Sequence, residues 1–97
     1  MKRVAWIYHS DYLLHIPPFE HPESPERLAA ITDHLGGAGL IDRMVPVTPE
    51  YPEDADILSV HDREYLNKLE NACRRGDLTF DSEDTYLNRH SFNIALL

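Results

Sequence analysis

The alternation of apolar and polar positions along this chain predicts one short strand followed by several helices. Residues 4–8 form a continuous apolar run rich in β-forming side chains, which is typical of a strand buried on both faces in a parallel sheet. Apolar positions then recur at helical spacing over residues 25–35 and 63–75, and glycine follows both stretches. A brief helix over residues 53–58 and a final helix beginning near Ser91 complete the pattern. This order of elements indicates an α/β protein.

In three other stretches the apolar residues recur at neither helical nor strand spacing. Residues 9–23 contain two adjacent prolines and read as a long loop, and connections of this length are often functional. Residues 44–51 contain two further prolines, so they fit either a short edge strand or an extended link. Residues 78–84 are polar and acidic, and we expect a loop there. Because one strand cannot complete a parallel sheet, we expect the sheet to need neighbours.

The most constrained segment is the start of the first long helix. From His21 to Arg27 the sequence reads His-Pro-Glu-Ser-Pro-Glu-Arg, and its two prolines fix φ and keep the residues before them extended. Ser24 suits the N-cap position, and a proline suits the first helical position after it. Arg27 should therefore leave the first turn in a nearly fixed direction. From local chemistry alone, its partner is Glu23 or Glu26 in a surface ion pair.

Composition and charge narrow the classes of function. The chain has 97 residues, enough for at most one small domain, and its 42% hydrophobic and 27% charged residues match ordinary globular usage. The net charge of −8 argues against a nucleic-acid partner, because phosphate binding needs the opposite sign. The acidic excess lies mostly in residues 49–84, where it would attract a cationic acetylated polyamine or a lysine-rich tail. A solvated surface is the simpler interpretation.

Features that would indicate secretion, a membrane or a metal are weak. Cys73 is the single cysteine, which fits a reducing compartment, and no apolar run approaches membrane-spanning length or a signal sequence. We therefore expect a cytoplasmic protein without a membrane partner. Zinc ligands within one element need histidines three to five residues apart, and no predicted helix holds such a set. The six histidines, for which we predict no metal site, are His9, His15, His21, His34, His61 and His90.

Several motifs, taken in order, resemble those of one known family. They are Ile7-Tyr8, Asp11-Tyr12, His21 to Arg27, Gly39-Leu40, Val60-His61 with Glu64-Tyr65, and Asp84-Thr85-Tyr86. Together they resemble the N-terminal part of the histone deacetylase superfamily, in the bacterial branch with acetoin-utilisation proteins and acetylpolyamine amidohydrolases. The resemblance implies the N-terminal part of a three-layer α/β/α parallel-sheet deacetylase fold, which is arginase-like and incomplete in this chain.

The resemblance also implies segments that this sequence does not contain. Family members are longer, zinc-dependent amidohydrolases whose metal is held by an Asp-x-His pair and a further Asp, assisted by a His-His pair and a tyrosine. None of those segments occurs here, and the sequence stops inside an apolar run. We expect residues 1–97 to be an N-terminal fragment of a deacetylase-like catalytic domain, with no catalytic residue or metal ligand and no activity alone. Zinc belongs to the full-length family, and we expect none bound by this chain.

Two residues are implied to line an inner cavity. Arg27 matches an arginine beneath the zinc that helps to hold or release acetate, a task that suits a guanidinium because it can give two hydrogen bonds to a carboxylate. Tyr8 matches a tyrosine of the same cavity, and the carboxyl end of a parallel strand is where ligand sites gather. From the residues alone, Tyr8 is equally a core tyrosine.

Residues of two loops are implied to form the rim of the site. His21 and Pro22 match the first active-site loop, which forms one wall of the acyl-lysine tunnel. Asp84 matches a rim carboxylate that accepts hydrogen bonds from the substrate backbone, and Glu83 beside it is the alternative. All of these are substrate-binding or product-binding roles.

Two functions follow from this reading. The first is the N-terminal segment of a zinc-dependent deacetylase-like amidohydrolase that removes acyl groups from acetylated lysine or polyamine amines, with this chain supplying a wall of the active site and the inner arginine. The second is a non-catalytic, truncated relative that acts as an interaction or self-association module through exposed strand edges. An unrelated small α/β protein with coincidental motifs is a third reading.

Overall fold

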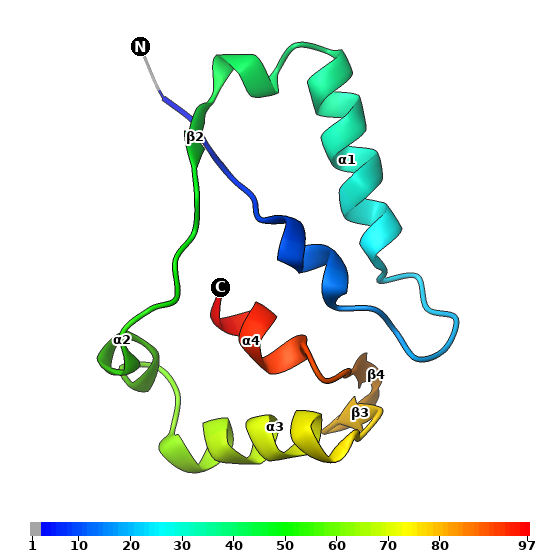
Figure 1. Cartoon of the computed structure of the whole chain (residues 1–97), viewed down its shortest axis with the longest axis vertical. Coiled ribbons are helices and arrows are strands. Elements are labelled where there is room, and N and C mark those ends of the chain that lie inside the picture. The colour runs from blue at the N-terminus through cyan, green and yellow to red at the C-terminus, as the bar shows by residue number, and fades with distance from the viewer. Residues whose placement is uncertain (1–2) are drawn as a thin grey trace.

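Short helices and strands joined by long loops make up residues 3–97, the part of the chain that the computed structural model describes. Figure 1 shows an open arrangement in which residues 48–53 run as a long loop to the helix that begins at Asp54. In chain order the elements are β1 (Ala5–Ile7), the 3-10 helix η1 (Ser10–Leu14), α1 (Pro25–Gly37), the 3-10 helix η2 (Ile41–Arg43), β2 (Val45–Val47), α2 (Asp54–Leu58), α3 (Arg63–Arg75), β3 (Thr79–Phe80), β4 (Ser82–Tyr86) and α4 (Ser91–Leu96).

The first sheet is parallel, as predicted. Strand β1 pairs with β2, with Ala5 opposite Val45 and Ile7 opposite Val47. Helix α1 lies in the crossover between the two strands, which is the βαβ connection of α/β proteins. Residues 44–51 therefore contain a short strand rather than only an extended link. The predicted α/β class, with a parallel sheet that is incomplete in these residues, is confirmed.

The prediction that the first strand is buried on both faces is wrong for the described residues. Ile7 exposes 57% of its surface, and the paired Val45 and Val47 expose 43% and 42%. A sheet of two strands keeps an unpaired edge on each strand and has few neighbours to cover its faces. An apolar strand that is exposed in this way needs further strands or helices to cover it.

Helix α1 begins as the sequence predicts and ends slightly later. Ser24 is extended (φ −149°, ψ 161°) and Pro25 is the first helical residue, but the Ser24 side chain makes no capping hydrogen bond. The helix continues to Gly37 rather than residue 35, and the chain reverses at Gly39, whose φ is +72°. Only a residue without a Cβ adopts that φ freely, so the stop signal is Gly39 and not the two glycines before it.

The prediction of a loop over residues 78–84 is also wrong. Strands β3 and β4 pair there as an irregular antiparallel hairpin, with Thr79 opposite Tyr86. Asp81 forms the turn at a φ of +63°, a region that aspartate tolerates better than most residues. The acidic side chains of this stretch have low strand propensity and obscured the strand pattern.

A small hydrophobic core lies among the elements of the second half of the chain. It contains Ala72 and Cys73 from α3 and Leu87 after β4, and Leu69, Phe80 and Phe92 pack against it. The predicted helix over residues 63–75 and its end at Gly76 (φ +83°) are confirmed, as are the brief helix α2 and the final helix at Ser91. This core keeps the hairpin and α4 against α3.

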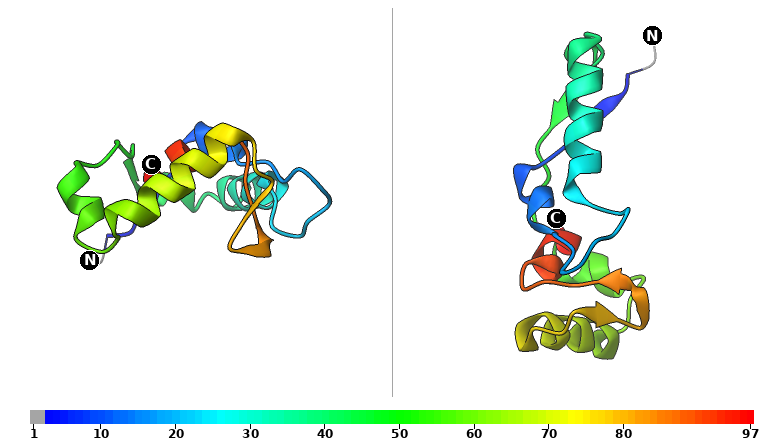
Figure 2. Two further views of the ribbon diagram at one scale, coloured as in Figure 1. Left: turned by 90° about the horizontal axis from the view of Figure 1, so that it is seen from below. Right: turned by 90° about the vertical axis from the view of Figure 1, so that its right-hand side faces the viewer.

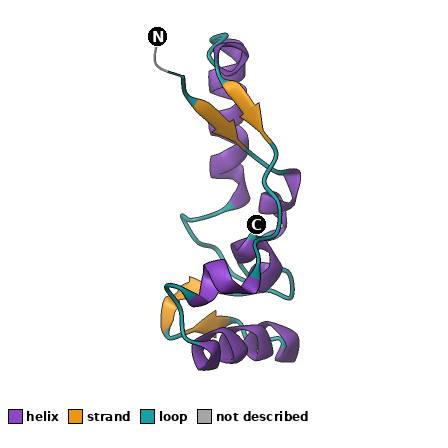
Figure 3. Ribbon diagram, turned by 90° about the vertical axis from the view of Figure 1, so that its left-hand side faces the viewer, coloured by secondary structure: helices purple, strands orange, loops and turns teal. Residues whose placement is uncertain are grey.

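The overall dimensions agree with a partial fold. The radius of gyration is 15.7 Å, whereas a compact domain of 100 residues has about 13 Å. Figure 2 shows how thin the molecule is along its shortest axis, and Figure 3 shows the two sheets at opposite ends. Among residues 3–97, no helix is both long and apolar enough to cross a membrane.

Candidate functional site

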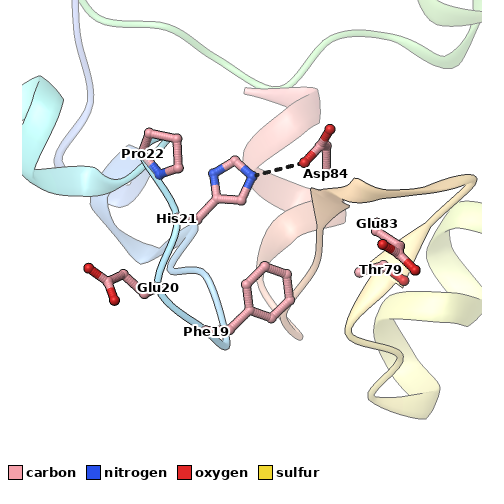
Figure 4. Close-up of a pocket in the computed structure, with 7 residues that line it drawn as sticks. All are labelled: Phe19, Glu20, His21, Pro22, Thr79, Glu83 and Asp84. Atoms are coloured by element: carbon pink, nitrogen blue, oxygen red, sulfur yellow. Dashed lines mark ion pairs between the residues drawn. The ribbon is translucent and has the colours of Figure 1, made fainter.

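A cavity of about 750 Å³ lies between the loop before α1 and the β3–β4 hairpin. Figure 4 shows loop residues on one side and hairpin residues on the other, although the two segments are far apart in the sequence. The cavity therefore brings together both segments that the resemblance implies to form a rim. Its lining residues are Phe19, Glu20, His21, Pro22, Thr79, Glu83 and Asp84.

His21 is held firmly at the wall of this cavity. Its side chain is only 14% exposed, and its Nδ1 accepts a hydrogen bond of 3.0 Å from the backbone N–H of Glu23. In a neutral imidazole the hydrogen then sits on Nε2. That atom lies 3.9 Å from Oδ1 of Asp84, as the dashed line in Figure 4 marks. The distance is too long for a hydrogen bond.

Acidic side chains outnumber His21 among the residues that line the cavity. Three carboxylates line it, from Glu20, Glu83 and Asp84, and its lining residues include no lysine or arginine. Asp84 is the carboxylate that faces His21, and its side chain is 99% exposed. Such a cavity favours cationic molecules over anionic ones, because its field attracts positive charge.

Tyr86 links the wall to the loop behind it. Its ring meets the edge of His21 at a centroid distance of 5.2 Å and stacks on His15 at 4.3 Å. Only 4% of Tyr86 is exposed, and this burial raises the pKa of its hydroxyl. The hydroxyl keeps its hydrogen and donates it to the backbone oxygen of His15 at 3.5 Å. Burial also lowers the pKa of His15, with an opposing effect from the charge of Glu23.

Arg27 and Tyr8 do not line this cavity. The Arg27 Nη2 lies 2.9 Å from Oε1 of Glu23, and both side chains are more than half exposed. This is the surface ion pair that local chemistry predicts. Tyr8 follows β1, stacks on Trp6 and meets Tyr12 edge-on, with centroid distances of 6.1 Å for both. Their roles toward acetate stay predictions from the resemblance.

Sequence reasoning missed other residues around the cavity. Phe19 and Thr79 line it, and no motif singled them out. Tyr86 stands in the Asp84-Thr85-Tyr86 motif, but no role at the cavity was predicted for it. Asn88 carried no sequence signal, and Ser91 was marked only as the start of a helix. Both contact the opposite loop, through hydrogen bonds to Leu14, Ile16 and His15.

The described residues do not fit a zinc ion. Zinc in proteins needs three or four nitrogen, sulfur or oxygen ligands around one point. Across residues 3–97, no three histidine, cysteine, aspartate or glutamate side chains come together in this way. His21 and Asp84 form a pair without a third ligand. A metal required by a larger domain would therefore need ligands from outside these residues.

Comparisons with known proteins agree on one family. The sequence profile of the histone deacetylase domain matches residues 21–97. The chain is 36% identical to an uncharacterised protein of Synechocystis over 97% of this chain, and 34% identical to a probable deacetylase of Archaeoglobus fulgidus over 94%. It is also 36% identical to type-2 histone deacetylase 1 of Dictyostelium discoideum over 78% of this chain.

The fold agrees with a solved deacetylase structure. The HDA15 HD domain superposes with a TM-score of 0.82 and 26% identity over 99% of this chain. The chain spans only part of each of these proteins: 32% of the Synechocystis protein, 25% of the Archaeoglobus protein, 5% of the Dictyostelium protein and 29% of the HDA15 chain. Since the profile covers most of the chain, including His21, Arg27 and Asp84, this protein belongs to the histone deacetylase family and spans part of its domain.

Proposed function

We propose that this chain forms the leading part of a deacetylase-like amidohydrolase, zinc-dependent in its full-length family, that acts on acetylated lysine or acetylated polyamines. The supporting observation is the cavity between residues 19–22 and the β3–β4 hairpin, because the hairpin and two of the loop residues, His21 and Pro22, lie within the family match. The chain contributes a wall of the substrate site and no metal ligand. We further propose that it belongs to the bacterial branch with acetoin-utilisation proteins and acetylpolyamine amidohydrolases.

The wall is suited to binding a substrate that carries positive charge. Pro22 restricts the loop, so less conformational entropy is lost when a substrate is held. The Nε2–H of His21 is available as a donor, and Asp84 is available as an acceptor beside it. Glu20 and Glu83 add negative charge to the same cavity. An amide flanked by ammonium groups, as in an acetylated polyamine or a lysine-rich peptide, fits this combination.

Arg27 is proposed to bind the acetate product, with Tyr8 lining the same inner cavity. In this structure Arg27 holds Glu23, and both side chains are more than half exposed. Exposed ion pairs contribute only about 0.2–1 kcal/mol, so the guanidinium can leave Glu23 at small cost. A carboxylate such as acetate offers it the same planar partner.

A second candidate function is supported by the exposed first sheet. Val4 and Ile7 are 58% and 57% exposed, and Val45 and Val47 lie beside them with more than a third of their surface open. Such a surface suits an interaction or self-association module. Sedimentation together with zinc content separates the candidates. A defined oligomer without metal favours the module, and a monomer that is ordered only in part favours the deacetylase segment.

A chimera tests the proposed function directly. This chain replaces the matching segment of the Archaeoglobus probable deacetylase, after acetate release by the parent protein has been measured. We expect the chimera to release acetate from an acetylated lysine peptide or from acetylputrescine. His21→Ala should reduce the release, whereas His61→Ala, which changes an exposed histidine outside the cavity, should not. A folded, zinc-loaded chimera without hydrolysis, beside an active parent, would contradict the proposal.

A further inference from the structure

The side chains of Asn88 and Ser91 hold the cavity-wall loop, residues 15–24, where it leaves the 3-10 helix η1. The Asn88 Nδ2 donates hydrogen bonds to the backbone oxygens of Leu14, at 2.6 Å, and Ile16, at 3.4 Å. The Ser91 Oγ lies 2.7 Å from Nδ1 of His15. These contacts join segments separated by more than 70 positions in the sequence. They fix the loop just before it reaches the cavity.

The polar atoms of this cluster satisfy one another. Ser91 is 5% exposed, and its Oγ accepts a hydrogen bond of 2.8 Å from the backbone N–H of Asn88. The Asn88 Oδ1 in turn accepts from the backbone N–H of His90 at 2.8 Å and from Ser91 Oγ at 3.3 Å. Ser91 is buried and Asn88 is partly buried, and a polar network whose members are all bonded has one preferred geometry. The cluster therefore offers the loop one docking position.

Aromatic ring contacts connect the docked loop to His21 at the cavity wall. His15 lies against one side of Tyr86 with an interplanar angle of 18°, and His21 meets Tyr86 at 65°. Displacing His15 would remove the support of the Tyr86 ring, against which His21 rests. The hydrogen bond from the Glu23 backbone to His21 Nδ1 requires the same loop shape.

We propose that Asn88, Ser91 and Tyr86 form a positioning cluster that sets the orientation and the Nε2–H tautomer of His21 at the cavity wall. The inference rests on the proposed function only in treating the cavity as the substrate site. The three residues act through His15 and the loop, so they are positioning residues rather than catalytic ones. Nothing in this role requires a metal or a substrate to be bound.

Nitrogen-15 spectra of the histidine rings in the full 97-residue chain, together with amide hydrogen exchange, test the cluster. In the unchanged chain we expect one dominant His21 tautomer, with the hydrogen on Nε2. In Asn88→Ala and Ser91→Ala we expect averaged tautomers and amide exchange over residues 19–23 that is faster by about tenfold, the effect of losing roughly one net hydrogen bond. Ser91→Thr keeps the hydroxyl, so it should keep the single His21 tautomer and the slow amide exchange over residues 19–23. Asn93→Ala, a matched change at an exposed position of α4, should not alter it.

The outcomes separate positioning from simple stabilisation. If the Asn88 and Ser91 variants lose thermal stability but keep the tautomer and the exchange rates of the loop, the cluster is only structural and the inference is overturned. A chain without long-range order around Tyr86 also overturns it. If Ser91→Ala unfolds the chain, Asn88→Asp takes its place in the test. It removes the side-chain donor and keeps an acceptor, and Asn88 is only partly buried. Failure of the proposed function would appear in acetate release and leave these spectra unchanged.

Discussion

Replacing Arg27 with alanine separates a functional arginine from a surface one, because the two roles predict different effects on stability and activity. In this structure the guanidinium contacts Glu23 at 2.9 Å, and the two side chains are 54% and 57% exposed. Exposed ion pairs stabilise by about 0.2–1 kcal/mol. Glu23 lies outside the helix, which begins at Pro25. Alanine also has a slightly higher helix propensity. We therefore expect the free energy of unfolding of the chain to change by less than about 1 kcal/mol.

The effect on activity should be far larger. A hydrogen bond to a charged group contributes about 1.5–3 kcal/mol, and the loss of one that stabilises the acetate group as it forms and leaves would lower activity roughly ten- to a hundredfold. Acetate release by the chimera described above measures this loss. Urea unfolding of the 97-residue chain, followed by circular dichroism, measures stability. A large loss of acetate release with little change in the free energy of unfolding would identify a functional role for Arg27.

Two matched variants control for the ion pair. Glu23→Gln breaks the same contact but keeps Arg27, so activity should change little. Arg74→Ala removes an arginine that forms an equivalent 2.9 Å pair with Glu70 on α3, and it should lower neither stability nor activity appreciably. If Arg27→Ala and Arg74→Ala affect acetate release equally, or if Glu23→Gln removes activity as Arg27→Ala does, the acetate-binding role of Arg27 is refuted.

Other predictions concern the small core and the loop behind the cavity. Leu87→Ala should lower the free energy of unfolding by about 2–5 kcal/mol, because Leu87 is only 4% exposed in the core. A lower urea midpoint or a lost cooperative transition would agree with this, and an unchanged midpoint would contradict it. Burial raises the pKa of the Cys73 thiol, so a thiol reagent should react slowly until denaturant opens the core; fast reaction in native buffer would contradict this burial. Burial lowers the pKa of His15 from 6.5, so the folded state binds fewer protons than the unfolded state, and the free energy of unfolding should fall as the pH drops below about 6.5. His15→Gln should reduce this pH dependence of the urea midpoint, and an unchanged dependence would exclude His15 as its source.

Elements determined by local pattern could be predicted from the sequence. The bounds of α3 follow from its apolar stripe and from Gly76, and the start of α1 follows from Ser24 and Pro25. The β3–β4 hairpin could not be predicted, because its acidic side chains give little strand signal and its pairing depends on packing against α3. The burial of β1 could not be predicted either, since it depends on neighbouring layers rather than on the strand itself.

The site divides in the same way. The resemblance brought attention to His21, Pro22 and Asp84, and the fold joins them around one cavity. The contacts of Asn88 and Ser91 with the opposite loop arise from tertiary packing, which no local spacing reports. The resemblance marked three of the residues that face the cavity, and no local pattern marked the contacts that support them.

The central claim is that these residues form a wall of a deacetylase site whose metal ligands lie outside them. Acetate release from an acetylated lysine peptide by the purified 97-residue chain, with zinc added and the bound zinc measured, tests it most directly. We predict no stoichiometric zinc and no hydrolysis above buffer. Stoichiometric zinc accompanied by turnover from this chain alone would contradict the claim.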